Sequence, residues 1–143
     1  MFDLDACVAF ITNKAAKKMA DEFNNRLMEL GITRVQWIAL YYLGKHNGIS
    51  QKELGELMDI KESTVARLID RMEKEDYVYR AKDENDRRIT LISLTEKGQK
   101  YREEFLPEGQ KMADVFTDGI SEDEINTFMK VLEKILLNIG QEL

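Results

Sequence analysis

The chain has little of what builds disulfides, metal clusters or long loops. Its 143 residues include one cysteine, one histidine, one proline and 8 glycines. A single cysteine excludes an internal disulfide and any cysteine-based metal cluster. Because proline and glycine are scarce, long loops are not expected and helices should dominate. A chain of this length is the usual size of a single domain.

Long apolar segments and leader-like features are missing as well. No apolar run reaches the roughly 18 residues that a membrane span needs, and the N-terminus lacks a basic region followed by an apolar core. The sequence therefore predicts no contact with a membrane and no secretory signal. Together with the single Cys7, these absences lead us to expect a cytoplasmic protein.

The usual catalytic motifs do not occur. There is no G-x-S-x-G, no P-loop and no G-x-G-x-x-G, so neither activated-serine hydrolysis nor nucleotide-dependent catalysis has a visible apparatus. One histidine without a cysteine cluster leaves only carboxylates for a metal, and the acidic runs "SEDE" and "DENDR" fit a helix cap and a turn. We expect no enzymatic activity, no cofactor and no metal site.

Charge is unevenly distributed along the chain. The net charge of −6 is unusual for a protein that binds nucleic acid. Residues 101–143 carry 4 basic and 10 acidic side chains, whereas residues 1–100 carry 17 of each. All of the excess acidity therefore belongs to the last third, and a basic surface can exist earlier in the chain. Association depends on that local field rather than on the total charge.

The first two thirds of the chain predict four helices and then a hairpin. One uninterrupted helix is predicted over residues 4–30, ending at Gly31. Thr33 and Gln36 have the spacing of a capping box and open a helix through "RVQWIALYYLGKH". Two short helices follow, "QKELGELMD" and "STVARLIDRMEKED". The β-formers in "YVYRAK" and "RITLISL" flank the turn "DENDR" and predict the hairpin.

The last part of the chain is helical again. Thr95 begins a helix over about residues 96–117, which Pro107 should kink or interrupt, and Ser121 with Glu124 begins the final helix. The helices at both ends of the chain are strongly apolar on one side, and the middle of the chain is too small to cover them. The expected cover is the same helices of a second copy, which predicts a twofold homodimer.

Two short helices joined by a tight turn and followed by a hairpin are the pattern of a winged helix-turn-helix. In such folds the second helix enters the major groove of DNA. Its apolar stripe should face inward, which leaves polar side chains on or near the outer surface: Ser63, Thr64, Arg67, Asp70, Arg71 and Lys74. The three basic ones fall at i, i+4 and i+7 and share one side. The alternative is an ordinary solvated face with ion pairs to Asp70, Glu73 and Glu75.

The hairpin tip places two arginines among acids. A wing beside such a helix reaches the minor groove, where negative potential attracts arginine. Asp86 lies two residues before Arg88, so its carboxylate can accept from the guanidinium and hold it in one orientation. Arg87 is a second basic residue at the tip. The alternative is a polar turn whose charges only keep the loop soluble.

Residues 63–98, "STVARLIDRMEKEDYVYRAKDENDRRITLISLTEKG", resemble the recognition helix and wing of the MarR family of transcriptional regulators. The D-x-R at Asp86–Arg88, the following "LISLTEKG" and the helix "STVARLIDRM" carry the resemblance, which extends more weakly to the whole chain. It implies a homodimer on a pseudopalindromic operator, usually acting as a repressor. Over residues 1–143 it implies one domain, with dimerisation helices in 1–32 and 100–143 and a DNA-binding lobe in 33–99.

The resemblance also implies residue roles. Arg88 would enter the minor groove with Asp86 as its support, and Arg87 would contact the backbone or stay solvated. Ser63, Thr64 and Arg67 would read the major groove, and Arg71 and Lys74 would contact phosphates. MarR-like proteins commonly respond to small phenolic or anionic effectors in a cleft between the dimer helices and the lobe. The candidate side chains are Lys14, Lys17, Trp37, Tyr41 and His46, although Trp37 and Tyr41 also suit a core and His46 a helix end.

Two further alternatives stay open at this point. Some relatives sense oxidants through a cysteine in the first helix, and Cys7 occupies a comparable place, although Asp3 and Asp5 would oppose a thiolate there. The winged module could also bind another protein instead of DNA. Salt would distinguish DNA binding from protein binding, because affinity for DNA falls steeply as the salt concentration rises, whereas affinity for a protein recognised through an apolar patch does not.

Overall fold

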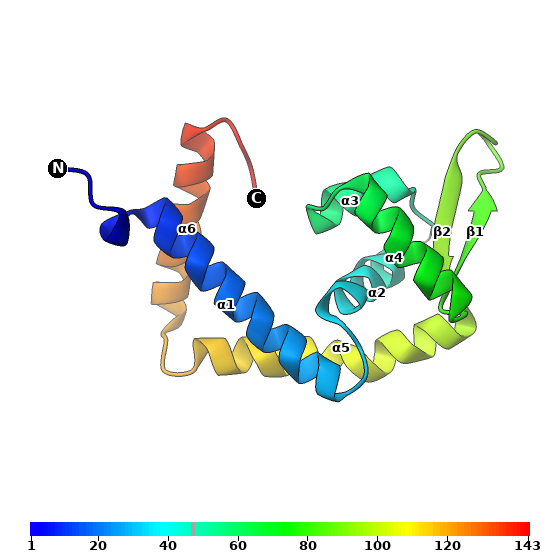
Figure 1. Ribbon diagram of the computed structural model, residues 1–143, viewed down its shortest axis with the longest axis horizontal. Coiled ribbons are helices and arrows are strands. Elements are labelled where there is room, and N and C mark those ends of the chain that lie inside the picture. Colours follow the sequence, from blue (N-terminus) through cyan, green and yellow to red (C-terminus); the bar gives the residue numbers. More distant parts are fainter. Residues whose placement is uncertain (47) are drawn as a thin grey trace. The chain divides into compact units, whose positions relative to one another are not determined.

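The computed structural model describes residues 1–46 and 48–143, which divide into two compact units, 1–108 and 109–143. The first unit contains a short 3-10 turn, η1 (Leu4–Ala6), and then α1 (Val8–Glu29), α2 (Arg34–Lys45), α3 (Gln51–Met58), α4 (Glu62–Lys74), β1 (Val78–Lys82) and β2 (Thr90–Leu94) (Figure 1). The helix α5 (Glu96–Thr117) begins in this unit and ends in the second, which also holds α6 (Glu122–Asn138). This is the mostly helical architecture with a β-hairpin that the sequence predicts.

The predicted capping boxes are present at two helix starts. Thr33 Oγ1 accepts from the Gln36 N–H at 3.1 Å, and Gln36 Oε1 accepts from the Thr33 N–H at 3.0 Å. Ser121 and Glu124 make the same reciprocal pair at 3.1 Å each. Caps of this kind typically contribute about 1 kcal/mol. They fix where α2 and α6 begin.

The predicted single helix from residue 4 is wrong at its start. Asp3 caps a separate short turn, because its side chain accepts from the Asp5 N–H at 3.0 Å. Cys7 is extended, with φ −73° and ψ 118°, and α1 begins only at Val8. Aspartate side chains compete with helical hydrogen bonds by bonding to the nearby backbone. That local bond explains the break.

Pro107 does not interrupt α5, contrary to the expectation from sequence. The helix just before it is fastened to α2 by side chains: Trp37 Nε1 donates to the Phe105 carbonyl at 2.7 Å, and Arg102 donates to the carbonyls of Leu40 and Tyr41 at 3.0 and 3.2 Å. A proline inside a helix costs roughly 3 kcal/mol through its missing N–H and its bulky ring. Packing onto α2 offsets this cost.

One core lies under the helix-turn-helix and the hairpin. Leu27 of α1, Leu40 of α2, Leu54 of α3, Ile69 of α4 and Ile92 of β2 are each at most 1% exposed. Burial of one such side chain contributes about 1.5–3 kcal/mol relative to leaving it in water. Because every element of the lobe contributes to this core, α4 and the hairpin are presented on a common support.

The hairpin is tied to the chain segment before α3. Strands β1 and β2 pair antiparallel, with Arg80 opposite Ile92 and Lys82 opposite Thr90. Ile49 forms a bridge to Ile92, donating to its carbonyl at 3.1 Å and accepting from its N–H at 2.7 Å. Strand β2 is therefore paired along both of its edges, with β1 on one edge and with Ile49 on the other.

The second unit exposes much of its apolar surface. Phe128, Met129, Val131 and Ile135 of α6 are between 38% and 53% exposed. Exposed apolar patches of this kind on a helix mark an interaction surface. Among the described residues, no helix combines the length and the apolar character needed to cross a membrane.

Candidate nucleic-acid interface

The outer face of α4 carries the predicted polar side chains. Val65, Ile69 and Met72 are at most 1% exposed and turn into the core. All six side chains predicted on or near the outer surface are exposed: Ser63, Thr64, Arg67, Asp70, Arg71 and Lys74. The helical period thus separates an apolar stripe from a basic one.

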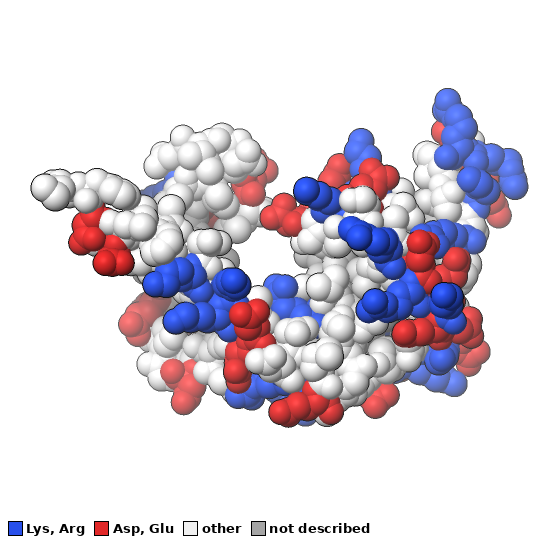
Figure 2. Space-filling view, viewed as in Figure 1, with Lys and Arg blue, Asp and Glu red and all other residues white. Residues whose placement is uncertain are grey.

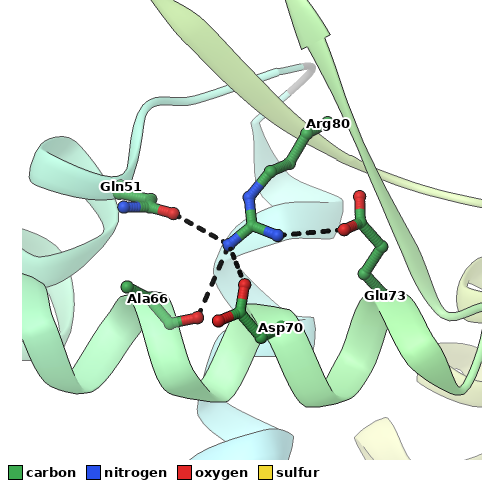
Figure 3. Close-up of polar contacts among 5 residues, drawn as sticks. All are labelled: Gln51, Ala66, Asp70, Glu73 and Arg80. Atoms are coloured by element: carbon green, nitrogen blue, oxygen red, sulfur yellow. Dashed lines mark hydrogen bonds and ion pairs between the residues drawn. The ribbon is translucent and has the colours of Figure 1, made fainter.

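The basic side chains of α4 are not engaged with the acids of the same helix. Asp70 and Glu73 pair instead with Arg80 of β1, at 2.8 and 3.0 Å (Figure 3). Across residues 1–46 and 48–143, neither Arg67 nor Lys74 makes an ion pair, and the same holds for Arg71. Their charged groups are available to a ligand.

Arg80 is a residue that the sequence analysis missed. Its guanidinium also receives contacts from α3 and the α4 backbone: Nη2 donates to Gln51 Oε1 at 2.9 Å and to the Ala66 carbonyl at 3.5 Å (Figure 3). The side chain is 22% exposed, so these contacts lie at the junction of wing and helix. The signal was a pair of acids at i, i+3 on α4 followed by a basic residue in the middle of the first strand.

The wing tip holds Arg88 in a defined orientation. Its Nε donates to Asp86 Oδ1 at 3.0 Å and its Nη2 to Asp86 Oδ2 at 2.9 Å, while its backbone N–H donates to the same carboxylate at 3.1 Å. The side-chain bond and then the backbone bond from Arg88 lower the pKa of Asp86, and the bond from Asp86 raises the pKa of Arg88. The Arg88 side chain is 90% exposed. A fixed and fully charged guanidinium therefore projects from the tip.

The acids of the tip also order its backbone. Asp83 Oδ1 accepts from the Asn85 N–H at 2.9 Å, and the Asp86 carbonyl accepts from the Ile89 N–H at 3.0 Å. The bond to the Asp83 side chain closes the turn, which is a structural reason for an acid beside the arginines. Figure 2 shows Lys and Arg dominating the tip of the hairpin. Arg87 is exposed there and makes no ion pair within the described ranges.

The five candidate effector residues fall into three places. Trp37 and Tyr41 stack at 6.2 Å, Trp37 packs edge-on against Phe23 at 5.1 Å, and its indole N–H is already bonded to Phe105. Lys14 and Lys17 are exposed on α1, nine and six residues before Phe23, or about 14 and 9 Å along the axis.

His46 lies apart from these residues. It lines a hollow of about 450 Å³ between the end of α2, the base of the wing and the start of α5, together with Lys45, Tyr79 and Gln99. None of the other four candidates lines that hollow. The five side chains are therefore not gathered in one site.

Known proteins match both the sequence and the fold. A family model for the MarR family matches residues 30–89. The organic hydroperoxide resistance transcriptional regulator of Bacillus subtilis is 31% identical over 100 residues, which cover 70% of this chain and 68% of that protein. The chain belongs to the MarR family. It is accordingly a DNA-binding transcriptional regulator with a winged helix-turn-helix, as the residues of α4 and the wing indicate.

Two solved structures of proteins bound to DNA share this fold. The MepR–DNA complex of S. aureus is 25% identical, with a TM-score of 0.83 over 92% of this chain and 98% of that one. A mutant MarR from E. coli complexed with operator DNA is also 25% identical, with a TM-score of 0.81 over 90% of this chain and 93% of that one. Both are similar to this MarR-family regulator along nearly its whole length.

Proposed function

We propose that this MarR-family regulator acts as a homodimeric, ligand-responsive repressor that binds a pseudopalindromic operator and blocks access to the promoter. The supporting observation is the fixed Arg88 guanidinium, which projects from the tip of the wing in the same compact unit as the unpaired basic stripe of α4. A preoriented arginine loses little entropy when it enters a narrow minor groove. The structures of relatives on DNA support the same mode of binding.

In this proposal each exposed side chain has a distinct role. Ser63, Thr64 and Arg67, in the N-terminal half of α4, read base edges in the major groove. Arg71 and Lys74, further along the same side, contact phosphates. Arg88 occupies the minor groove with Asp86 as its support, and Arg87 contacts the sugar-phosphate backbone.

Replacing Arg88 by alanine tests the wing directly. Arg88→Ala should weaken operator binding by about 1–3 kcal/mol, because a contact made inside a groove is lost. Arg87→Ala is the matched control, since it removes the same charge one residue away and should cost less. The measurement is a mobility-shift titration at fixed salt on a duplex selected from a random pool. Equal affinities of wild type and Arg88→Ala would remove the wing from the mechanism.

Dimerisation is assigned to the helices in residues 1–32 and 100–143, with residues 33–99 as the DNA-binding lobe. Two half-sites about one helical turn apart make affinity sensitive to the separation of the two reading helices. A small phenolic or anionic inducer would stabilise an unsuitable separation, through contacts from among Lys14, Lys17, Trp37, Tyr41 and His46. By linkage, a true inducer binds free dimer more tightly than operator-bound dimer. Calorimetry on both forms tests this, and equal affinities would contradict it.

A second candidate is thiol-based sensing through Cys7. Two observations favour it: Cys7 is a free, partly exposed thiol at the start of α1, and a relative is an organic hydroperoxide resistance regulator. Mild peroxide should then abolish DNA binding of the wild type and spare Cys7→Ser. Loss of binding in both proteins, or in neither, would exclude Cys7 as the sensor.

A further inference from the structure

Arg80 connects the wing to the two acids of the recognition helix, and this contact bears on DNA affinity. We propose that Arg80 is a positioning residue for DNA binding: it occupies Asp70 and Glu73 so that the basic stripe of α4 stays free for the duplex. The inference rests on the proposed roles of Arg67, Arg71 and Lys74 on DNA. It adds a residue that makes no contact with DNA itself.

The contacts of Arg80 use both terminal nitrogens of its guanidinium. Nη1 donates to Glu73 at 3.0 Å, and Nη2 pairs with Asp70 at 2.8 Å and with Gln51 Oε1 at 2.9 Å. Both acids keep a partly exposed surface, with 67% of the Asp70 and 44% of the Glu73 side chain open to solvent. Arg80 therefore neutralises two carboxylates that stand on the surface of α4, next to its basic stripe.

Helix geometry shows what these acids would otherwise do. Asp70 lies three residues after Arg67 and four before Lys74, which are the spacings at which side chains on a helix meet. Freed from Arg80, Asp70 would pair with one of these cations and withdraw it from a phosphate or a base. Glu73 would add an uncompensated negative charge where the duplex approaches.

Arginine is suited to this task in a way that lysine is not. The planar fork presents donors in fixed directions, so one side chain serves two carboxylates and an amide at once. A lysine at position 80 carries the same charge but offers one compact head, which suits one carboxylate well. Arg80→Lys is thus expected to fall between wild type and a neutral variant.

The first measurement compares wild type with Arg80→Met on a duplex selected from a random pool by the wild-type protein. Titrations run over a series of salt concentrations. Arg80→Met should weaken binding about tenfold, and the slope of log affinity against log salt should fall in magnitude by about 1, as one phosphate contact is lost. Unchanged affinity and slope would overturn the inference. Thermal unfolding of each variant ensures that only folded protein is compared.

The second measurement separates charge neutralisation from simple support of the wing. Asp70→Asn with Glu73→Gln, added to Arg80→Met, removes the acids while leaving the wing unclamped. If Arg80 acts by occupying the acids, affinity and salt slope return to within about threefold of wild type. The same pair of substitutions in a protein that keeps Arg80 should raise the affinity for DNA much less, because there the acids are already neutralised. Equal gains in both backgrounds, or no recovery, would overturn the proposal.

The outcome also distinguishes this inference from the proposed function. Failure of the wild type to select any duplex would overturn both. A selected duplex that is lost on Arg88→Ala but insensitive to Arg80→Met would leave the proposed function standing and overturn this inference alone.

Discussion

At the scale of single residues, two aspartates hold backbone conformations that usually belong to glycine. Asp59 after α3 has φ +55° and Asp76 after α4 has φ +64°. At the end of α4, the Asp76 N–H donates to the Glu73 carbonyl at 3.0 Å and the Tyr77 N–H to the Met72 carbonyl at 2.9 Å. This pair of bonds is the Schellman ending of a helix, whose C′ position is most often glycine. The strained backbone of Asp76 reverses the chain direction between the end of α4 and the start of β1.

Asp76→Gly should stabilise the protein by about 0.5–1 kcal/mol. A left-handed conformation costs a residue with a Cβ roughly 1–2 kcal/mol, and glycine avoids this cost. Part of the gain is lost because glycine has greater conformational freedom in the unfolded chain. Denaturant unfolding measures the change. Asp76→Ala is the control and should bring no gain, since alanine keeps the Cβ. A stabilising alanine would show that strain is not the cause.

The Asp86–Arg88 pair sets a pH dependence at the wing tip. Since the bonds from Arg88 lower the pKa of Asp86 below its usual 3.8, the pair's contribution is fully present above that value and is lost as pH falls through the lower folded pKa. NMR of the carboxyl carbons should show Asp86 titrating below 3.8 in wild type and closer to it in Arg88→Ala. Glu124, whose pKa is lowered by Ser121, is the control and should not respond. A response of both carboxyls would contradict a local cause.

At the scale of elements, the sequence predicted the features that depend on residues close together in the chain. It missed those that depend on contacts between distant segments. Thr33 and Gln36 lie within four residues, so their spacing alone places the start of α2. The same short range predicted the apolar stripe of α4 and the Asp86–Arg88 pair. Arg80 meets Gln51 and Asp70 only after the hairpin has folded back over α4, and its role could not be seen from spacing. Continuity of α5 through Pro107 likewise depends on packing against α2.

The joint between α4 and α5 is another contact of this long-range kind. The Thr95 hydroxyl donates to the Asp76 carbonyl at 2.6 Å, the Thr95 N–H donates to the Tyr77 carbonyl at 3.0 Å, and Lys97 Nζ donates to the Glu75 carbonyl at 2.8 Å. Tyr77 also stacks on Tyr101 at 4.4 Å. The carbonyls at the end of the recognition helix are thus satisfied by the start of α5.

Gly98 is required by this joint, because a Cβ there would collide with the Tyr77 carbonyl oxygen. Gly98→Ala should destabilise the protein by about 1–3 kcal/mol, as expected when the backbone must shift to admit a methyl group. Lys100→Ala, an exposed position on the same helix, should stay within about 0.5 kcal/mol of wild type. Chemical denaturation of the three proteins measures both. An unaffected Gly98→Ala would show that the joint is compliant.

At the scale of the whole molecule, the proposed dimer brings together the two strongest features of the chain: uncovered apolar helices at its ends and a basic reading surface in its middle. The net charge of −6 is compatible with DNA binding because 10 of the 27 acids lie in residues 101–143, outside the lobe. A twofold arrangement would bury the apolar faces and present two lobes to one duplex.

Placing a charge on the apolar face of α6 tests this arrangement. Phe128 and Ile135 lie seven residues apart on one side of the helix and are 53% and 38% exposed. Phe128→Glu should shift the protein towards monomer by at least tenfold in dissociation constant, because a buried unpaired carboxylate is costly. Lys130→Glu on the opposite side should leave association unchanged. Sedimentation velocity reports both, and a monomeric wild type would contradict the dimer.

The break at Cys7 has a practical consequence. The chain carries one thiol, partly exposed, at the join between η1 and α1. In a symmetric pair of chains, one nitroxide attached to this sulfur would occur twice, so pulsed electron paramagnetic resonance would yield a single inter-label distance without any cysteine engineering. Recording that distance with and without duplex would reveal whether the N-terminal ends move when the operator is released.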